Sequence, residues 1–322
     1  MKKSLLLLPY LAGWALLLIS ETFRAVALTN GLLQLLLFTF VVCIPAWRTG
    51  RMSYVDIGWP WGLVIIGAVT LAFGLGDGNH LRLLLVCGLY ALIGGRMGYY
   101  ALKLWRAGVL KTELARYRYQ ARRWEKSGER NVPLARQVEV LAQGLANASY
   151  LAYPAMLVAS NSNGQLSYLE IAGFCVALAA LSLESVADYQ KAAFSARAKA
   201  EGRVNAVCDI GLWRYSRHPN YFFEWMVWNG LIVMSLPALP GVFEEESIVV
   251  AVLITCGLLF ISKIMYQTLV HYTGAKPAEY YSVKKRPAYA DYQRTTNRFF
   301  PGPRKTLSPS TDPTSAVEGE AE

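Results

Sequence analysis

Charged side chains are scarce in this chain of 322 residues: Asp, Glu, Lys and Arg make up 17% of it. Ordinary soluble domains carry roughly 25%. Hydrophobic residues make up 54%, and apolar runs of about 20 residues, each long enough to cross a bilayer, recur along most of the chain. The composition excludes an ordinary soluble domain and predicts an all-α fold, a polytopic transmembrane helical bundle.

Motifs for metal or disulfide chemistry are also missing. The chain has five cysteines and three histidines, with no CxxC motif and no Cys/His cluster. Four of the cysteines fall in apolar runs, which is typical of small buried residues. We therefore expect neither disulfides nor a metal site. The Rossmann fingerprint GxGxxG is absent as well, and the glycine-rich stretch 74–78 predicts only a turn.

The apolar runs define about eight candidate spans, with seven to ten allowed. They cover residues 4–20, 26–46, 55–75, 81–104, 138–160, 168–189, 221–240 and 247–269. No cleavage site follows the first run, so it predicts a retained helix rather than a signal peptide. We expect one transmembrane domain over residues 1–300. The Pro-, Ser- and Thr-rich residues 301–322 predict a disordered tail.

Basic residues divide unevenly between the two sides of this layout. With the N-terminus assigned to the cytoplasm, 27 of the 32 Lys and Arg residues fall on the cytoplasmic side and only Arg24 and Arg82 on the other. This asymmetry follows the positive-inside rule and predicts that both termini are cytoplasmic. The net charge of +10 then needs no nucleic-acid partner, because the basic residues face lipid headgroups or an anionic ligand. In a bacterium this would be a multi-pass protein of the inner membrane.

Several polar side chains fall inside predicted spans, where each raises a functional hypothesis. Asp56 is either an interfacial helix cap or an acid facing an internal cavity, where burial would keep it protonated and able to donate to a carbonyl oxygen. Arg96 and Tyr99 share a helix face. Arg96 lies too deep for simple snorkelling, and we expect Asp56 or a ligand as its partner.

Residues 183–224 concentrate further polar groups. Glu184 and Asp188 lie four apart on one helix face, either as salt-bridge partners or as the wall of a polar cavity. Arg214, Arg217 and His218 precede a helix start, where free N–H groups and the helix dipole suit phosphate. The stripe from Asn220 through Glu224 carries polar groups into the membrane, which a surface charge cluster does not explain. The loop 113–130 predicts a helix at the membrane surface, with or without a ligand-binding role.

Four stretches together resemble the steroid 5-alpha-reductase superfamily, and within it the bacterial DUF1295-type membrane proteins. They are "VDIGW" (55–59), "ESVADYQKAAF" (184–194), "GLWRYSRHPNYFFEW" (211–225) and "KRPAYADYQRTTNRFFP" (285–301). The resemblance implies a membrane reductase that binds NADPH from the cytoplasm, with its NADPH-site motifs at 184–224 and 285–301. By similarity, Asp188 would contact the nucleotide. The cofactor region would also include Glu184, Arg214, Tyr215, Arg217, His218, Asn220, Tyr221, Glu224 and Tyr292.

The expected activity is NADPH-dependent reduction of an activated carbon–carbon double bond in a steroid- or isoprenoid-like lipid, with Asp56, Tyr99 and Glu224 as catalytic residues. Two alternatives stay open. The "RHPNY" element also occurs in isoprenylcysteine-type methyltransferases, which use S-adenosylmethionine. A lipid-binding or transport protein without enzymatic activity could use the same scaffold.

Overall fold

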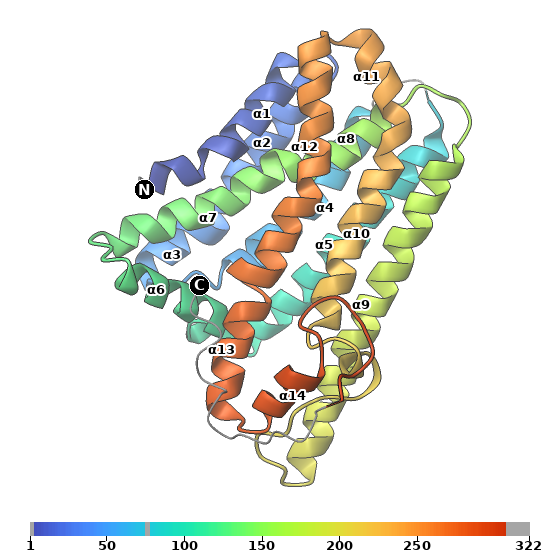
Figure 1. Ribbon diagram of the computed structural model, residues 1–322. Helices are drawn as coiled ribbons and strands as arrows, with labels where there is room; N and C mark the ends of the chain where they lie inside the picture. Colours follow the sequence, from blue (N-terminus) through green and yellow to red (C-terminus); the bar gives the residue numbers. More distant parts are fainter. Residues whose placement is uncertain (1–2, 75–77, 307–322) are drawn as a thin grey trace.

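The computed structural model describes residues 3–74 and 78–306, and every regular element in these residues is helical. This confirms the all-α prediction. The α-helices are α1 (Leu8–Ile19), α2 (Arg24–Leu37), α3 (Ile44–Thr49), α4 (Val55–Phe73), α5 (His80–Arg106), α6 (Ala115–Lys126), α7 (Val132–Ala148), α8 (Tyr153–Ser160), α9 (Tyr168–Ala200), α10 (Pro219–Ser235), α11 (Leu239–Glu245), α12 (Ile248–Gln267), α13 (Ala275–Lys285) and α14 (Tyr289–Thr295). The long helices form a tilted bundle, and α6, α13 and α14 gather at one end of it (Figure 1).

Six of the described helices, some joined end to end, are long and apolar enough to cross a membrane. They are Arg24–Thr49, Val55–Phe73, His80–Arg106, Tyr168–Ala200, Pro219–Glu245 and Ile248–Lys285. The protein therefore has the helices of a multi-pass membrane protein, and these six match six of the eight predicted spans.

The other two predicted spans are also helical, but neither forms a long continuous helix. The first corresponds to α1, which has only 12 residues. The fifth, 138–160, is divided between α7 and α8, because Ser149 leaves helical geometry and the next α-helix begins at Tyr153, with Pro154 in its first turn. Nearly all of α8 is buried by protein, so hydropathy detects an apolar segment without revealing that protein covers it. The count of eight spans stays a prediction.

Loops that the sequence assigns to the same side contact one another. At one end, Ser20 bonds Glu246 at 2.5 Å, and Asn79 bonds the Gly164 carbonyl at 3.0 Å. At the other end, Arg51 bonds the Leu110 carbonyl at 2.7 Å. The two groups of loops thus lie at opposite ends of the bundle, as the charge asymmetry requires.

The helix pair α9–α10 forms one wall of the bundle (Figure 1). Two glycines let these helices approach closely. A Cβ on Gly173 would lie 2.4 Å from the Met234 nitrogen, and one on Gly230 would lie 2.6 Å from the Ala177 nitrogen. Small residues at such crossings allow backbone-to-backbone packing between membrane helices. This packing fixes the positions of the polar side chains that α9 and α10 carry.

A buried amide network joins α2, α4 and α7. Asn30, Gln34 and Asn147 are at most 1% exposed. Gln34 donates to Asn30 at 3.1 Å and to the Gly62 carbonyl at 2.8 Å. The Asn147 side chain donates to the Trp59 carbonyl at 3.0 Å, and the backbone carbonyl of Asn147 accepts from the Asn30 side chain at 3.1 Å. The hydrogen bonds of these amides cross-link three helices, and none of the three amides was predicted as a functional residue.

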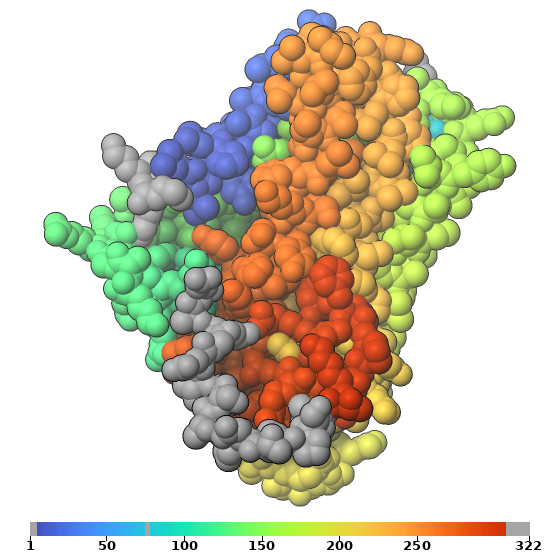
Figure 2. All heavy atoms as spheres, in the orientation of Figure 1, coloured from blue at the N-terminus to red at the C-terminus, as the bar shows by residue number. Residues whose placement is uncertain are grey.

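The C-terminal segment after α12 folds back against the bundle. Figure 2 shows its residues, in red, lying over the lower part of the molecule beside the orange helices. Residues 301–306 form no regular element. The rest of the predicted disordered tail, 307–322, lies outside the described residues.

Candidate functional site

A charged cluster joins α5, α9 and α10 in the half of the bundle nearest α6 and α14. Arg96 on α5 donates to Glu184 and, at 3.1 Å, to Asp188, both on α9. Asn220 on α10 donates to the other oxygen of Asp188 at 3.1 Å. The side chains of Glu184, Arg96 and Asp188 are 7%, 27% and 48% exposed, so the cluster runs from the interior to an accessible edge.

Glu224 completes this cluster from the next turn of α10. It is close enough to Arg96, Arg116 and Asp188 to interact electrostatically, and it also interacts with Glu184. Asn220 and Glu224 are one helical turn apart, as the sequence stripe predicts. The structure therefore brings Glu184, Asp188, Asn220 and Glu224 together. It also pairs Arg96 with the two acids of α9, and Asp56, its expected protein partner, lies elsewhere.

Asp56 has a partner of its own at the start of α4. Arg116 on α6 forms an ion pair with it, and the Tyr117 hydroxyl donates to it at 2.6 Å. Asp56 thus accepts hydrogen bonds from Arg116 and Tyr117, whereas the cavity alternative required it to donate one. Burial, and then the adjacent Asp56 carboxylate, raise the pKa of Tyr117 well above its ordinary value, so Tyr117 stays protonated at neutral pH.

Tyr221 connects these groups to the loop before α10. It interacts electrostatically with Arg116, Glu224 and Asp188. Its ring stacks on His218, with centroids 5.3 Å apart and planes only 3° from parallel. The stack places Tyr221 between the charged cluster and the loop residues that sequence analysis assigned to the cofactor.

Arg217 and His218 belong to a buried ion cluster centred on Glu279 of α13. Arg217 Nε lies 2.7 Å from Glu279 Oε1, and His218 Nε2 lies 3.2 Å from the same oxygen. Arg217 also donates to the carbonyls of Gln293 and Thr296, at 2.8 and 2.5 Å. These contacts occupy the guanidinium, which is 7% exposed. Arg217 thus joins the loop to the C-terminal segment and is not open to the phosphate contact we expected.

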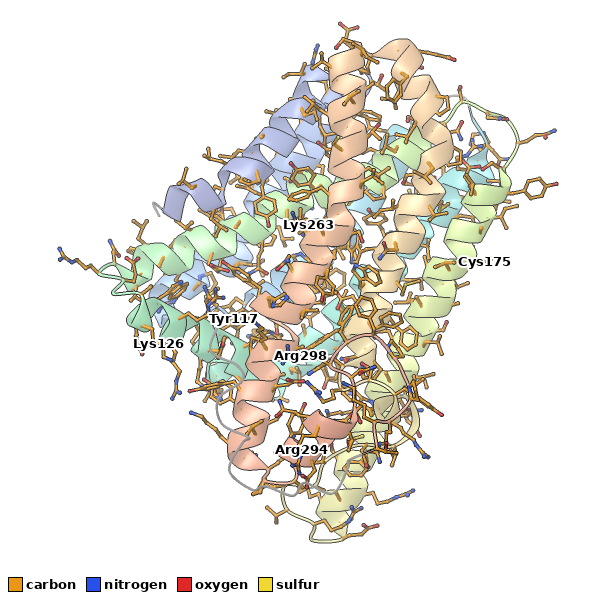
Figure 3. All side chains as sticks on the ribbon, viewed as in Figure 1. Tyr117, Lys126, Cys175, Lys263, Arg294 and Arg298 are labelled. Atoms are coloured by element: carbon orange, nitrogen blue, oxygen red, sulfur yellow. The ribbon has the colours of Figure 1, made fainter. Side chains whose placement is uncertain are left out.

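The C-terminal motif is fastened to the same loop by further contacts. The Tyr292 hydroxyl donates to the Trp213 carbonyl and, at 3.3 Å, to that of Ser216. Ser216 donates to the Phe299 carbonyl at 2.8 Å. Arg298, labelled in Figure 3, adds a 3.2 Å ion pair to Glu279. Tyr292 therefore acts through the loop backbone, holding the segment that leads into Asn220.

Three predicted residues lie apart from the cluster. Tyr99 is 67% exposed on α5, and Tyr215 is 50% exposed in the loop. Arg214 is exposed as well. Tyr99 shares a helix face with Arg96 by sequence spacing, yet its ring lies outside the packed interior. The structure gives it no contact with Asp56 or Glu224.

Three residues that pair with predicted site residues, Arg116, Tyr117 and Glu279, were not predicted from the sequence. Arg116 and Tyr117 lie in a polar loop whose basic residues suggested a surface helix, and Glu279 lies between the recognised motifs. Their partners are far away in the chain, so helical periodicity holds no signal for these contacts. The sequence held one signal for a partner such as Arg116, because an acid at the start of an apolar helix needs a cation or hydrogen-bond donors.

A basic cavity of about 320 Å³ lies beyond the cluster, at the far end of α9. Its lining includes Lys199, Arg203, Lys285 and Arg286. Lys199 is 11 residues after Asp188 on the same helix, which corresponds to about 16 Å along the helix axis. Within the described residues, no group of three or more His, Cys, Asp or Glu could hold a metal ion. The charged cluster and the cationic cavity thus lie at different heights along α9.

The fold is that of a helical membrane protein, and charged residues from α4, α5, α6, α9 and α10 lie close together beside the loop before α10. The chain belongs to the family described as "Protein of unknown function (DUF1295)", which matches residues 39–296. The matched range includes every helix from α3 to α14. No curated protein and no solved structure matches the chain.

Proposed function

We propose that this protein is an NADPH-dependent membrane reductase that acts on an activated carbon–carbon double bond in a steroid- or isoprenoid-like lipid. The observation that carries the proposal is the convergence of Arg96, Glu184, Asp188, Asn220 and Glu224 from three helices. Four of these five lie in the stretches that resemble the reductase superfamily. Apolar helices around the cluster suit a lipid-like substrate that arrives from the bilayer.

Unsatisfied polar atoms in the cluster fit a nicotinamide. Among the described residues, Asn220 Oδ1 and Arg96 Nε are buried without a hydrogen-bond partner. One is an acceptor and the other a donor, and both side chains contact Asp188. A carboxamide offers an N–H donor and a carbonyl acceptor, so it would satisfy both atoms. Asn220 and Arg96 are therefore the residues that would hold the nicotinamide end.

The basic cavity fits the phosphate-bearing end of the same cofactor. Lys199, Arg203, Lys285 and Arg286 line it, and charge-assisted hydrogen bonds from Lys and Arg are the usual means of binding phosphate. The cavity and the cluster both include residues of α9, so an extended cofactor would lie along this helix. Arg203 and Arg286 replace Arg217 as the arginines we assign to phosphate.

The residues around Asp56 suit activation of the substrate. When bound, NADPH supplies a hydride for the β-carbon of an alkene conjugated to a carbonyl. Arg116 is held by Asp56 and Tyr117, and its guanidinium has further donors that can polarise the carbonyl oxygen. The α-carbon takes its proton from water or from a side chain of the site. Asp56 and Tyr117 orient Arg116, and Tyr99 receives no role in this scheme.

Cofactor binding tests the proposal directly. Purified protein should bind NADPH, with an affinity that falls as salt rises, because cations at an exposed cavity are screened. Arg203→Ala and Arg286→Ala should each weaken binding by about tenfold or more, the loss expected for a charge-assisted hydrogen bond. Arg130→Ala, an exposed cation outside the cavity, is the matched control and should bind as the parent does.

The two alternatives predict different results in the same assay. Binding of S-adenosylmethionine without measurable NADPH binding would identify a methyltransferase. Binding of neither, with lipid still retained, would favour a lipid-binding or transport protein. Transfer of deuterium from labelled NADPH to an enone lipid would establish the reductase chemistry itself.

A further inference from the structure

A patch of tyrosines and cations covers the outer surface where α6 meets α13. The Tyr280 hydroxyl lies 2.6 Å from Arg122 Nη1 and 2.7 Å from Lys284 Nζ, accepting from both. The guanidinium of Arg122 also lies 5.6 Å from the Tyr280 ring centre, and that of Arg118 lies 5.6 Å from the ring centre of Tyr281. We call these five residues the tyrosine–cation patch.

Among the residues that the structure describes, no acid pairs with the cations of this patch. Within residues 3–74 and 78–306, no ion pair links Arg118, Arg122 or Lys284 to a carboxylate, whereas Arg96 and Arg217 both have such partners. A phenol oxygen that accepts from two cationic donors keeps its own O–H to donate. The patch therefore offers three positive charges and a hydroxyl group that is free to donate, which together complement a phosphate group.

The position of α6 relates this patch to the membrane surface. Tyr117 on α6 bonds Asp56 in the first turn of α4, so α6 lies at the ends of the spanning helices. Trp47 at the end of α3 and Trp105 at the end of α5 are 63% and 53% exposed. Exposed tryptophans at span ends are typical of headgroup depth. One face of α6 buries Tyr117, Gln120 and Trp124, and its opposite face carries the arginines.

We propose that the tyrosine–cation patch binds the phosphate of an anionic phospholipid headgroup from the adjoining leaflet. Charge complementarity selects this occupant. A zwitterionic phosphatidylcholine would place its own cation against three like charges, whereas the phosphate of phosphatidylglycerol brings no cation with it. The patch is separate from the charged cluster and the basic cavity, so this proposal does not depend on the proposed reductase activity.

Lipid retention measured by native mass spectrometry tests the proposal. The full-length protein is reconstituted in nanodiscs that contain equal amounts of phosphatidylglycerol and phosphatidylcholine, then released and weighed. We expect bound phosphatidylglycerol in preference to phosphatidylcholine. Arg122→Ala/Lys284→Ala should lower this retention by about tenfold or more, because it removes two charge-assisted donors. Tyr280→Phe should lower it less, since it removes only the hydroxyl and leaves the cations.

The control removes the same charge from the same region. Lys126→Ala/Arg130→Ala deletes two exposed cations at and just beyond the end of α6, and Figure 3 shows Lys126 directed away from the bundle. This variant should retain phosphatidylglycerol as the parent does, and both double variants should bind NADPH as the parent does. If both double variants lost phosphatidylglycerol to the same extent, general charge attraction would explain the retention, and the proposal would be overturned. Equal retention of the two lipids by the parent, or displacement of the lipid by millimolar inorganic phosphate alone, would overturn it as well.

Discussion

Asn220 donates a 3.1 Å hydrogen bond to Asp188 across the interface between α10 and α9. This bond joins the first turn of α10 to the helix that carries both the charged cluster and the basic cavity. Asp188 also accepts a hydrogen bond from Arg96 at 3.1 Å. Its two carboxylate oxygens therefore receive donors from two helices, and Asp188 links the parts of the proposed cofactor site.

Replacement of Asn220 or Glu224 by leucine should abolish cofactor binding or turnover without unfolding the protein. A polar stripe in a membrane helix costs free energy unless its groups are satisfied, so an apolar replacement should leave thermal stability unchanged or higher. NADPH titration and a melting curve on the same sample separate the two effects. Aggregation of Glu224→Leu would instead identify Glu224 as a structural partner of Arg96.

Arg96→Leu should destabilise the protein by about 3 kcal/mol, because it leaves the buried Glu184 without its cation. The double variant Arg96→Leu/Glu184→Leu should recover most of this loss, since both charges are then absent. The unfolding midpoint in detergent measures the two effects. A double variant no more stable than Arg96→Leu would show that the pair contributes through other contacts.

Arg217→Ala should lower stability more than it lowers the NADPH affinity of the folded protein. The change removes the shortest ion pair of Glu279, which is 5% exposed, and a buried charge that loses its partner costs about 3–5 kcal/mol. Arg294→Ala is the control, because its ion pair with Asp291 is exposed on both sides and is worth about 0–1 kcal/mol. If Arg217→Ala lost NADPH affinity but melted at the parental temperature, Arg217 would be a phosphate-binding residue, as the sequence predicted.

Stability should decrease as the pH falls below about 6.5. Burial lowers the pKa of His218, although the hydrogen bond to Glu279 opposes this. The unfolded chain therefore binds the proton at a higher pH than the folded protein does. The contribution of neutral His218 to stability is fully present above the pKa that this residue has in the unfolded chain. It is lost as the pH falls through the pKa of His218 in the folded protein. Lys191 and Arg217 also disfavour protonation of His218.

Melting midpoints between pH 7.5 and 5.5 should reveal this dependence, and His218→Gln should flatten it over that interval. His80→Gln, at an exposed position, should keep the parental slope. A parental slope in His218→Gln would assign the titration to another group.

Gly164 and Glu245 should face the side opposite to both termini. The prediction rests on the division of basic residues, and the structure places the loops of these two residues at the same end of the bundle. Single cysteines at the two positions, in a background without the five native cysteines, should react with a membrane-impermeant thiol reagent only from outside the cytoplasm. Labelling of either position from the cytoplasmic side would contradict the layout of spans.

Much of this fold follows from local sequence signals. Apolar runs locate the helices, and the spacing of Glu184 with Asp188 and of Asn220 with Glu224 correctly places each pair on one helix face. The stretches 184–194 and 211–225 resemble parts of one cofactor site, which predicts that α9 and α10 lie side by side. These features depend on periodicity and on short motifs, both of which are visible in the sequence.

Features that depend on contacts between distant segments could not be predicted in this way. Arg116 reaches Asp56 from 60 residues away, and Glu279 meets Arg217 from 62 residues away. Neither pairing has a sequence period. The division of the fifth apolar run into α7 and α8 was missed for a related reason, since hydropathy does not distinguish lipid from apolar protein as the surroundings of a segment.

The amide network of Asn30, Gln34 and Asn147 has a consequence for how the chain is assembled. Asn30 and Gln34 enter the membrane with α2, but the backbone carbonyl of Asn147 and its side chain arrive only with α7, more than a hundred residues later in synthesis. Until then, Asn30 lacks a partner outside its own helix, and an unsatisfied amide in hydrocarbon is costly. The hydrogen bonds that join α2 to α7 can therefore form only after α7 has been synthesised, whereas the bond from Gln34 to the Gly62 carbonyl of α4 can form earlier.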